Sequence, residues 1–228
     1  MEKFKMVFKN LIGKGLSKFD YPIIVNSYGR SGSTVLTESI IDSSIEVNNP
    51  NLENLVFRSI SQEAWDLNSA NLKNGIVYKT HDYPPSSYSN ENLKMLYTFA
   101  DPVDVVLSLL RLFDEKGEEW IKLHYEHLGV SYTDTFNQII SEDQLNLEKH
   151  LNKWLNEKRI PIAFIRYESM WNHQDDISDF LGFKVMLPEF RNRKSSKEND
   201  LNVIEEIEKS YKQLRENISR LDDFFIIN

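Results

Sequence analysis

The sequence contains no cysteine, which excludes disulfide bonds and thiolate chemistry. A chain without cysteine fits a reducing compartment, and we expect this protein to be cytoplasmic. Basic residues are also few: 27 Lys and Arg stand against 35 Asp and Glu, and the net charge of −8 argues against nucleic acid as a partner. An anionic small molecule can still bind, because its binding depends on local charge in a cleft. No spacing typical of metal ligands is present, and we expect no metal cofactor.

Internal repeats, low-complexity tracts and linkers are absent as well. The 228 residues, 40% of them hydrophobic, suffice for one core, and we predict a single domain over residues 20–228. Residues 1–19 interleave five lysines with apolar residues, which is typical of a basic amphipathic helix. This segment lacks the uninterrupted apolar stretch of a signal peptide and is too broken to span a membrane. We expect it to pack on the domain, with contact to an anionic membrane surface as the alternative.

Strand and helix patterns alternate along the rest of the chain. Short apolar runs predict strands at 23–25, 76–79, 93–99 and 161–166. Apolar residues at helical spacing predict helices after the first strand and over 52–67, 102–113, 118–158, 169–181 and 200–221. This alternation predicts a three-layer α/β fold with a central parallel sheet of four to five strands and helices on both faces. Ligands of such folds bind at the carboxyl ends of the strands.

The first strand leads into a glycine-containing loop, Gly29-Arg-Ser-Gly-Ser-Thr34, and then into a helix. Glycines let the backbone turn tightly, and the unpaired N–H groups of a helix start point at whatever sits in the loop. Arg30 adds a fixed positive fork, and Ser31, Ser33 and Thr34 add hydroxyl groups. A phosphate or sulfate group is the expected guest, although a glycine turn that only reverses the chain is the alternative.

This loop is not a Walker A motif, which has four residues between its glycines and a Lys-Ser/Thr after the second. Only Arg30 and Ser31 separate the glycines here, and Ser33 stands where the lysine would be. The loop instead resembles the 5′-phosphosulfate loop of sulfotransferases that use 3′-phosphoadenosine-5′-phosphosulfate (PAPS). Carbohydrate-type members of that family have Arg-Ser-Gly-Ser-Ser/Thr, and cytosolic members have Lys-Ser-Gly-Thr-Thr. The resemblance implies that residues 30–34 bind the 5′-phosphosulfate.

A second segment, Tyr78-Lys-Thr-His-Asp-Tyr-Pro84, resembles the Lys-Thr-His-x-Pro segment of cytosolic sulfotransferases, with one additional residue before the proline. In that family the histidine is the catalytic base. A lone histidine is most often an ordinary loop residue, but the place of His81 at a strand end, two residues after Lys79, favours a functional role. The resemblance implies that His81 is the base and that Lys79 and Arg30 lie near the transferring group.

Further segments match the family in the same order along the chain, from about residue 21 to 197. Asp101, Pro102, Asp104 and Ser108 are in register with the 3′-phosphate segment, although helix capping sufficiently explains the two carboxylates. Tyr167 resembles the tyrosine that approaches the adenine. The basic stretch that includes Arg191, Arg193 and Lys194 resembles the loop that closes on the 3′-phosphate.

The chain departs from the family pattern at Ala100, where the family has an arginine that binds the 3′-phosphate. Losing such a charge-assisted contact costs on the order of 1.5–3 kcal/mol unless another group replaces it. Arg111 lies three residues beyond Ser108 on the same helix face and is one candidate. Arg191 or Arg193 is the candidate that the sequence favours.

Together these segments imply transfer of a sulfuryl group from PAPS to an acceptor hydroxyl or amine, which leaves 3′-phosphoadenosine-5′-phosphate (PAP). The acceptor is expected to be a small molecule or a carbohydrate. Residues 52–65, with Tyr83 and Tyr88, are expected to line its pocket, or else to belong to the core. Three alternatives stay open: a non-catalytic or degenerate PAPS-fold nucleotide-binding protein, a P-loop nucleotide kinase, which would need the absent lysine, and a peripheral membrane interaction protein that would use the N-terminal helix.

Overall fold

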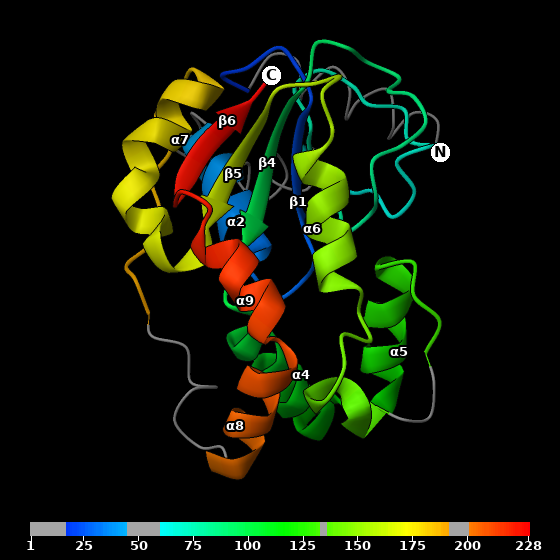
Figure 1. The fold of residues 1–228 in the computed structure, drawn as a ribbon. Coiled ribbons are helices and arrows are strands. Elements are labelled where there is room, and N and C mark those ends of the chain that lie inside the picture. Colours follow the sequence, from blue (N-terminus) through cyan, green and yellow to red (C-terminus); the bar gives the residue numbers. More distant parts are fainter. Residues whose placement is uncertain (1–16, 45–59, 133–135, 192–200) are drawn as a thin grey trace.

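The computed structural model describes residues 17–44, 60–132, 136–191 and 201–228. Within these ranges the centre of the molecule is a six-stranded sheet with the order β2-β3-β1-β4-β5-β6 (Figure 1). Neighbouring strands run parallel except β6, which is antiparallel to β5. The strands are β1 (Ile23–Ser27), β2 (Ser61–Glu63), β3 (Val77–Lys79), β4 (Lys94–Phe99), β5 (Ile162–Arg166) and β6 (Phe224–Ile227).

Helices cover both faces of the sheet, as Figure 1 shows for α6 on one face and α2 on the other. Side chains alternate between the faces along each strand. Ile24, Tyr97 and Phe164 belong to the hydrophobic cluster that includes α4, α5, α6, α8 and α9. Ile23 and Ile165 belong to the cluster that includes α2 and α7. The helices are α2 (Ser33–Ser44), α4 (Pro102–Lys116), α5 (Glu118–His127), α6 (Leu147–Leu155), α7 (Gln174–Leu181), α8 (Leu201–Ser210) and α9 (Lys212–Ser219), with 3₁₀ turns η1 (Phe136–Ile140) and η2 (Tyr167–His173).

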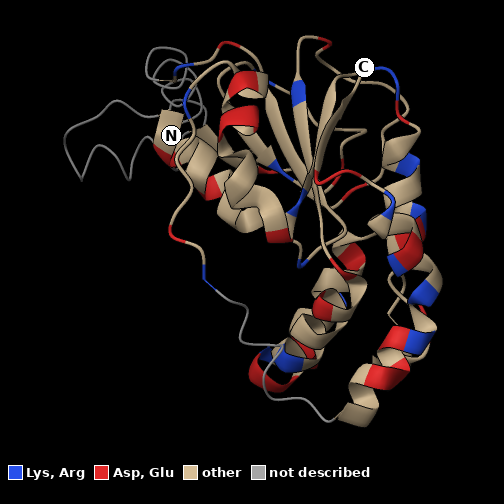
Figure 2. Cartoon of the chain, turned by 60° about the vertical axis from the view of Figure 1, so that its left-hand side comes forward, with Lys and Arg blue, Asp and Glu red and all other residues tan. Residues whose placement is uncertain are grey.

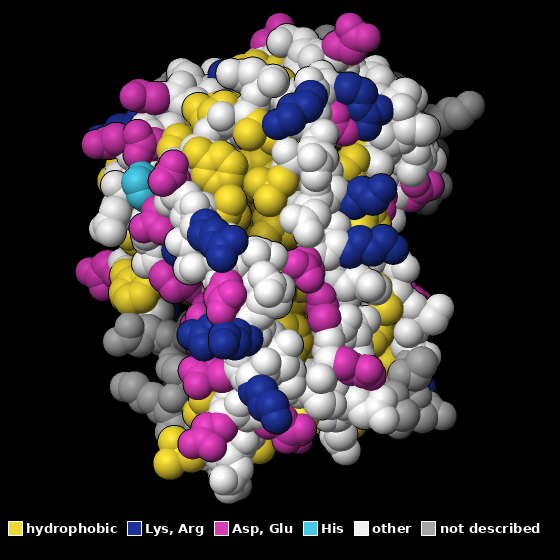
Figure 3. Space-filling model, in the orientation of Figure 1, with side chains coloured by type: hydrophobic (Ala, Val, Ile, Leu, Met, Phe, Trp, Pro, Cys, Tyr) yellow, Lys and Arg dark blue, Asp and Glu magenta, His cyan; other side chains and the backbone are white. Residues whose placement is uncertain are grey.

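The predicted fold class, a three-layer α/β structure around a parallel sheet, is confirmed. Its strands are near-continuous apolar runs because both of their faces are buried. The antiparallel strand β6 was not predicted. Its Phe225 stacks on Phe164 with ring centroids 4.9 Å apart, and Phe225 and Ile227 are half-buried against the first cluster. Figure 3 shows hydrophobic side chains gathered at the surface over this part of the sheet.

Other predicted boundaries need correction. The helix predicted over 52–67 is wrong at its end, because Ser61–Glu63 forms the edge strand β2, which pairs with Val77–Lys79; residues 52–59 lie outside the described ranges. The continuous helix predicted over 118–158 is three pieces, α5, η1 and α6. The helix predicted over 200–221 is divided at Tyr211 into α8 and α9. In the second of these segments the predicted inward-facing residues Leu147, Leu151 and Trp154 are buried, but irregular stretches interrupt the helical backbone.

Two predicted helix ends are confirmed. The carboxylate of Asp101 accepts a hydrogen bond of 2.9 Å from Val103 N and caps α4, whose first residue is Pro102. Gly182 ends α7 in the left-handed conformation at φ 77°. Of the predicted N-terminal helix only residues 17–19 are described, and Phe19 stacks on Phe183. No helix of the described residues is long and apolar enough to cross a membrane.

The charges of the molecule are mixed on its surface. Figure 2 shows the positions of basic and acidic residues intermixed along the helices that project below the sheet. Many of these charges are paired on one helix, such as Arg111 with Glu115 and Lys122 with Glu118. The cations of interest for an anionic ligand are therefore those that the fold brings together at the carboxyl edge of the parallel strands.

The loop between β1 and α2 lies at that edge, and its glycines meet two aromatic rings. Gly29 and Gly32 have φ values of 85° and 87°, in the left-handed region that favours glycine. A Cβ on Gly32 would lie 2.1 Å from Cδ2 of Tyr167, and a Cβ on Gly29 would lie 2.5 Å from Cε1 of His124. Both positions therefore require glycine, because the backbone has a positive φ there and because the rings lie too close to leave space for a Cβ.

We expect Gly32→Ala to lower the free energy of unfolding by about 2–4 kcal/mol, because it adds a collision with the Tyr167 ring to the backbone strain. Gly117→Ala is the matched control, since Gly117 also has a positive φ of 80° but a Cβ there would meet nothing within 4 Å. Urea unfolding of both variants measures the difference. Tyr167→Ala should recover part of the loss in Gly32→Ala; equal losses for the two glycine variants, or no recovery, would contradict this account.

Candidate functional site

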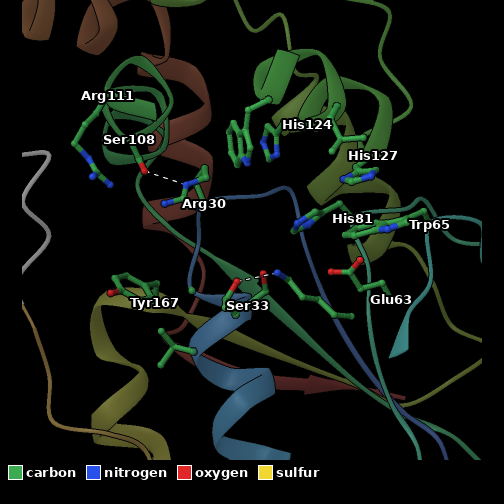
Figure 4. Close-up of a pocket in the computed structure, with 16 residues that line it drawn as sticks. Arg30, Ser33, Glu63, Trp65, His81, Ser108, Arg111, His124, His127 and Tyr167 are labelled. Atoms are coloured by element: carbon green, nitrogen blue, oxygen red, sulfur yellow. Dashed lines mark hydrogen bonds between the residues drawn. The ribbon is translucent and has the colours of Figure 1, made fainter. Parts of the chain in front are cut away.

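A cavity of about 430 Å³ opens at the carboxyl edge of the sheet (Figure 4). Its walls come from the loop after β1 and the start of α2, from the ends of β2 and β3, from α4 and α5, and from the turn after β5. Elements that are distant in sequence therefore meet in one place. Among the predicted site residues, it brings together Arg30, Gly32, Ser33, Thr34, Lys79, His81, Ser108 and Tyr167.

One end of this cavity is built to receive an anion. The first turn of α2 supplies backbone N–H groups without helical partners, and Ser33 and Thr34 line the cavity beside them. Lys79, at the end of β3, donates a 2.8 Å hydrogen bond to Thr34 Oγ1. Burial lowers the pKa of Lys79, and Arg30 lowers it further, whereas Glu63 raises it. A negative charge in the cavity would offset the cost of holding two cations close together.

Ser31 is turned away from the cavity. Its side chain is fully buried, and its hydroxyl donates a 2.9 Å hydrogen bond to the carbonyl oxygen of Thr98 on β4. The hydroxyl therefore joins the loop to the neighbouring strand. Ser33 and Thr34 are the loop hydroxyls that line the cavity, and Ser33 is also held by Ser27, whose hydroxyl donates to it at 3.1 Å.

His81 lies across the cavity from the α4 wall, and its ring is held in one orientation. Its Nδ1 lies 2.9 Å from the carbonyl oxygen of Ser27 and 3.1 Å from the Ser27 hydroxyl. Because the carbonyl can only accept, Nδ1 carries the proton and Nε2 is the unprotonated, basic nitrogen. Burial lowers the pKa of His81 well below its ordinary value, and His124 and Lys79 add to this effect. The imidazole is therefore neutral at pH 7.

The carboxylate next to His81 is occupied elsewhere. Asp82 accepts hydrogen bonds from the backbone N–H groups of Leu67 at 2.7 Å and Tyr83 at 2.8 Å, so it holds the loop together. The carboxylate that lines the cavity is Glu63, at the end of β2. Figure 4 shows Glu63 beside Trp65 and below His81. Glu63 falls within residues 52–65, which were expected to line the acceptor pocket, but it was not singled out because residues 61–63 lay inside a predicted helix.

The α4 wall carries Ser108 and Arg111 on one face. Arg30 Nε donates a 3.0 Å hydrogen bond to Ser108 Oγ, so the loop and the helix are joined (Figure 4). Arg111 lines the cavity one turn further on, and its Nη1 pairs with Glu115 at 2.9 Å. Arg111 Nε is buried without a hydrogen-bond partner among the described residues. An unsatisfied buried donor in a cavity wall is available to a ligand oxygen.

Ala100 has no exposed surface, and its backbone N–H and carbonyl oxygen both form hydrogen bonds with the hydroxyl of Tyr28. The Tyr28 hydroxyl accepts a 2.7 Å hydrogen bond from Ala100 N and donates to Ala100 O at 2.5 Å. A longer side chain at position 100 would therefore have to displace this packing. Arg191 is exposed and does not line the cavity, and Arg193 and Lys194 lie outside the described residues.

The far wall comes from α5, which sequence reasoning missed. Trp120, His124 and His127 lie at i, i+4 and i+7, a spacing that places them on one helix face. The His127 ring stacks on Trp65 with centroids 3.7 Å apart, and Trp120 stacks on His124. The spacing of these residues indicates that they share one helix face, but nothing in the sequence indicates that this face points toward the cavity. Of the aromatics expected around an acceptor, Trp65 lines the cavity, whereas Tyr83 and Tyr88 do not.

The α5 histidines are uncharged as well. Burial lowers the pKa of His124 to about 3, with Arg30 as the next cause, and His124 Nε2 has no hydrogen-bond partner in the part of the chain that is described. Burial also lowers the pKa of His127. Across the described ranges, no group of three or more His, Asp or Glu side chains could hold a metal ion. The cavity thus combines cationic Arg and Lys side chains with neutral imidazoles.

Comparison with known proteins adds little to this geometry. No protein-family model matches the chain, and no curated protein matches it in sequence. Among solved structures, the mouse sulfotransferase SULT7A1 in complex with PAP is 17% identical, with a TM-score of 0.41, over 92% of this chain and 72% of that one. Since that similarity is too low to carry an inference, the function has to be argued from the site itself.

Proposed function

We propose that this protein is a sulfotransferase that transfers a sulfuryl group from PAPS to an acceptor hydroxyl or amine. One observation carries the proposal: a single cavity holds an anion cradle at one end and a neutral histidine with an unprotonated Nε2 at the other. The cradle consists of the α2 N-terminus with Arg30, Ser33, Thr34 and Lys79. This arrangement suits a reaction in which an anionic group is held while an acceptor loses a proton.

The proposed reaction is an in-line displacement at sulfur. The acceptor oxygen forms a bond to sulfur, the bond from sulfur to the phosphate oxygen breaks, and His81 Nε2 takes the acceptor proton. The products are the sulfated acceptor and PAP. Arg30 and Lys79 stabilise the negative charge that spreads over the transferring group and the leaving oxygen. The leaving oxygen becomes part of a phosphate with a second pKa of ~6, so it needs little protonation and Arg30 can take the place of a lysine.

The nucleoside part of the cofactor is assigned to the α4 side. Ser108 and Arg111 are proposed to hold the 3′-phosphate, with the unpartnered Nε of Arg111 as a donor. Tyr167 is proposed to contact the adenine, since its ring lies over Gly32 and lines the cavity. The role of a loop that closes on the 3′-phosphate is still assigned to Arg191, Arg193 and Lys194, and this assignment rests on the resemblance of the sequence alone.

The acceptor end is lined by Trp65, Trp120 and His127. These aromatic faces suit a small molecule or a carbohydrate, both of which stack on aromatic rings. The proposed reaction requires neither a nucleic acid nor a metal ion. We propose that it takes place in the cytoplasm. The competing functions, a non-catalytic PAPS-fold protein and a nucleotide kinase, differ from it in measurable ways.

The first prediction concerns the ligand. Titration calorimetry of the purified chain should show binding of PAP at least tenfold tighter than binding of ATP, because the cavity offers cations for phosphates at both ends of a nucleoside but lacks the Walker lysine. AMP, which lacks the 3′-phosphate, serves as the reference nucleotide. ATP binding as tight as PAP binding would favour the kinase instead.

The second prediction concerns the base. His81→Ala should reduce turnover with labelled PAPS and a mixed set of acceptors by ~10²–10⁴-fold, while the affinity for PAP changes by less than about twofold. His173→Ala is the control and should leave turnover unchanged, because His173 lies outside the cavity and contacts Asp176 at 2.7 Å. Undiminished turnover in His81→Ala would remove the role from His81, and Glu63→Gln would then test the cavity carboxylate. A wild-type chain that binds PAP but transfers no sulfuryl group would be a binding protein.

The third prediction concerns the missing arginine. Arg111→Ala should reduce the ratio of PAP to AMP affinity by about tenfold, which corresponds to a charge-assisted contact of ~1–2 kcal/mol. Glu115→Ala is the matched control, because it breaks the same exposed ion pair but leaves Arg111 in place. If Arg191→Ala reduces the ratio and Arg111→Ala does not, the exposed basic stretch holds the 3′-phosphate and our assignment is wrong.

A further inference from the structure

The chain that carries His81 leaves the sheet but stays at least partly buried over residues 80–85. Strand β3 ends at Lys79, and residues 80–85 form neither helix nor strand. Backbone carbonyls in such a stretch need hydrogen-bond partners from elsewhere, because a buried carbonyl without one is costly. The carbonyls of His81 and Asp82 obtain theirs from side chains of two other elements, β1 and α6.

Three side-chain N–H groups converge on the carbonyl oxygen of Asp82. Asn26 Nδ2 donates to it at 3.0 Å, Trp154 Nε1 at 3.0 Å and His150 Nε2 at 3.1 Å. His150 Nε2 also lies 2.9 Å from the carbonyl oxygen of His81. A carbonyl oxygen has two lone pairs, so one or two donors would satisfy it. We call Asn26, His150 and Trp154 the Asp82 carbonyl clamp.

The hydrogen-bond partners of His150 determine which of its ring nitrogens carries the proton. His150 Nε2 faces two carbonyl oxygens and must carry a proton, so in the neutral ring Nδ1 accepts a 2.8 Å hydrogen bond from the Tyr97 hydroxyl. Burial lowers the pKa of His150 to about 4 and raises the pKa of Tyr97 well above its ordinary value, so both stay neutral. The network is fully satisfied and can adopt only this arrangement of donors and acceptors.

Asn26 connects the clamp to the ring of the base. Its Nδ2 binds the Asp82 carbonyl, and its Oδ1 accepts a 2.6 Å hydrogen bond from the backbone N–H of Ser27. Ser27 in turn holds Nδ1 of His81 through its carbonyl oxygen and its hydroxyl. The backbone of His81 and its ring are therefore held by one continuous set of hydrogen bonds. His150, Trp154 and Asn26 have no exposed surface and do not line the cavity.

We propose that His150, Trp154 and Asn26 are positioning residues, which fix the peptide after His81 so that Nε2 of this histidine faces the cavity. None of the three contacts the reacting atoms. The proposal rests on the proposed function in so far as His81 is the base, but the geometry it concerns exists in the free protein. A misplacement of about 1 Å at a catalytic group can reduce a rate by about 10²-fold, so such support has a measurable effect.

The experiment observes the His81 ring directly in the ligand-free protein. Two-bond ¹⁵N–¹H correlation spectra of chain labelled with ¹⁵N-histidine identify which ring nitrogen carries the proton, and His81→Ala assigns the signal. In the wild type we expect one tautomer, with the proton on Nδ1. In His150→Leu we expect a mixture of tautomers, and in His150→Gln, whose amide can still donate to the carbonyls, a return toward the single tautomer. This readout needs neither PAPS nor an acceptor.

Kinetics give a second readout if the chain transfers sulfuryl groups. His150→Leu should lower kcat by about 10²-fold and change PAP affinity by less than about twofold, with partial recovery of kcat in His150→Gln. Tyr211→Phe is the matched control for Tyr97→Phe: each removes one buried hydroxyl, but that of Tyr211 donates to Ile139 and Glu142, outside the network. Only Tyr97→Phe should alter the His81 signals and kcat.

Should His150→Leu fail to fold, Trp154→Phe removes one donor of the clamp and leaves two in place. We expect it to fold and to shift part of the His81 population to the second tautomer. The proposal is overturned if His81 keeps its single tautomer in each of the folded clamp variants, or if Tyr211→Phe alters His81 as much as Tyr97→Phe. Absence of transfer in the wild type would overturn the proposed function and leave the spectroscopic test intact.

Discussion

The close approach of two rings to one loop sets the form of the site. His124 from α5 and Tyr167 from the turn after β5 pack against Gly29 and Gly32, at positions where a Cβ would lie within 2.5 Å and 2.1 Å of ring atoms. The two rings leave this loop little room to move, and both glycines have positive φ values that other residues adopt only with strain. Arg30, which also has a positive φ of 53°, is directed from this fixed backbone toward Ser108 on α4. The β1–α2 loop thus contacts each of the cavity walls that come from α4, α5 and the turn after β5.

The electrostatics of the cavity follow from burial beside fixed cations. Burial lowers the pKa values of Lys79, His81 and His124, and a neighbouring cationic side chain lowers each of them further. A group whose proton is disfavoured in the empty cavity becomes more basic when an anion enters, because the anion stabilises the protonated form. Anion binding and proton uptake are therefore linked. In the proposed reaction, this linkage makes His81 a stronger base once the phosphosulfate is bound.

Local sequence patterns were sufficient for features that depend on neighbours in the chain. The buried strands, the Asp101 cap and the glycine loop each have a signature within a few residues, and the structure has them where the sequence predicts them. Features that depend on pairing across the fold were not predictable. Strand β2 is three residues long and exists because it pairs with β3, and β6 is too short to be distinguished from a frayed helix end.

The same limit applies to the candidate site. The sequence places Ser31 among the loop hydroxyls, but only the adjacent strand β4, with the Thr98 carbonyl, explains why its side chain turns inward. His124 and His127 carry a helical spacing, yet the orientation of α5 depends on packing against Trp65 and the loop. The clamp residues lie 56 to 72 positions away from Asp82 in the sequence, and no local pattern connects them to it.

The residue at position 100 shows how packing determines where a charge can be placed. Ala100 is enclosed, and its N–H and carbonyl are both bound to the Tyr28 hydroxyl, which also brings the Tyr28 ring against Tyr97. An arginine there would have to bury a guanidinium or displace this ring, and each is costly. Arg111 reaches the same cavity from the surface of α4, where its side chain is partly exposed and pairs with Glu115. With the strand end closed by Tyr28, Arg111 on α4 brings a second cation, besides Arg30, to the wall of the cavity that carries Ser108.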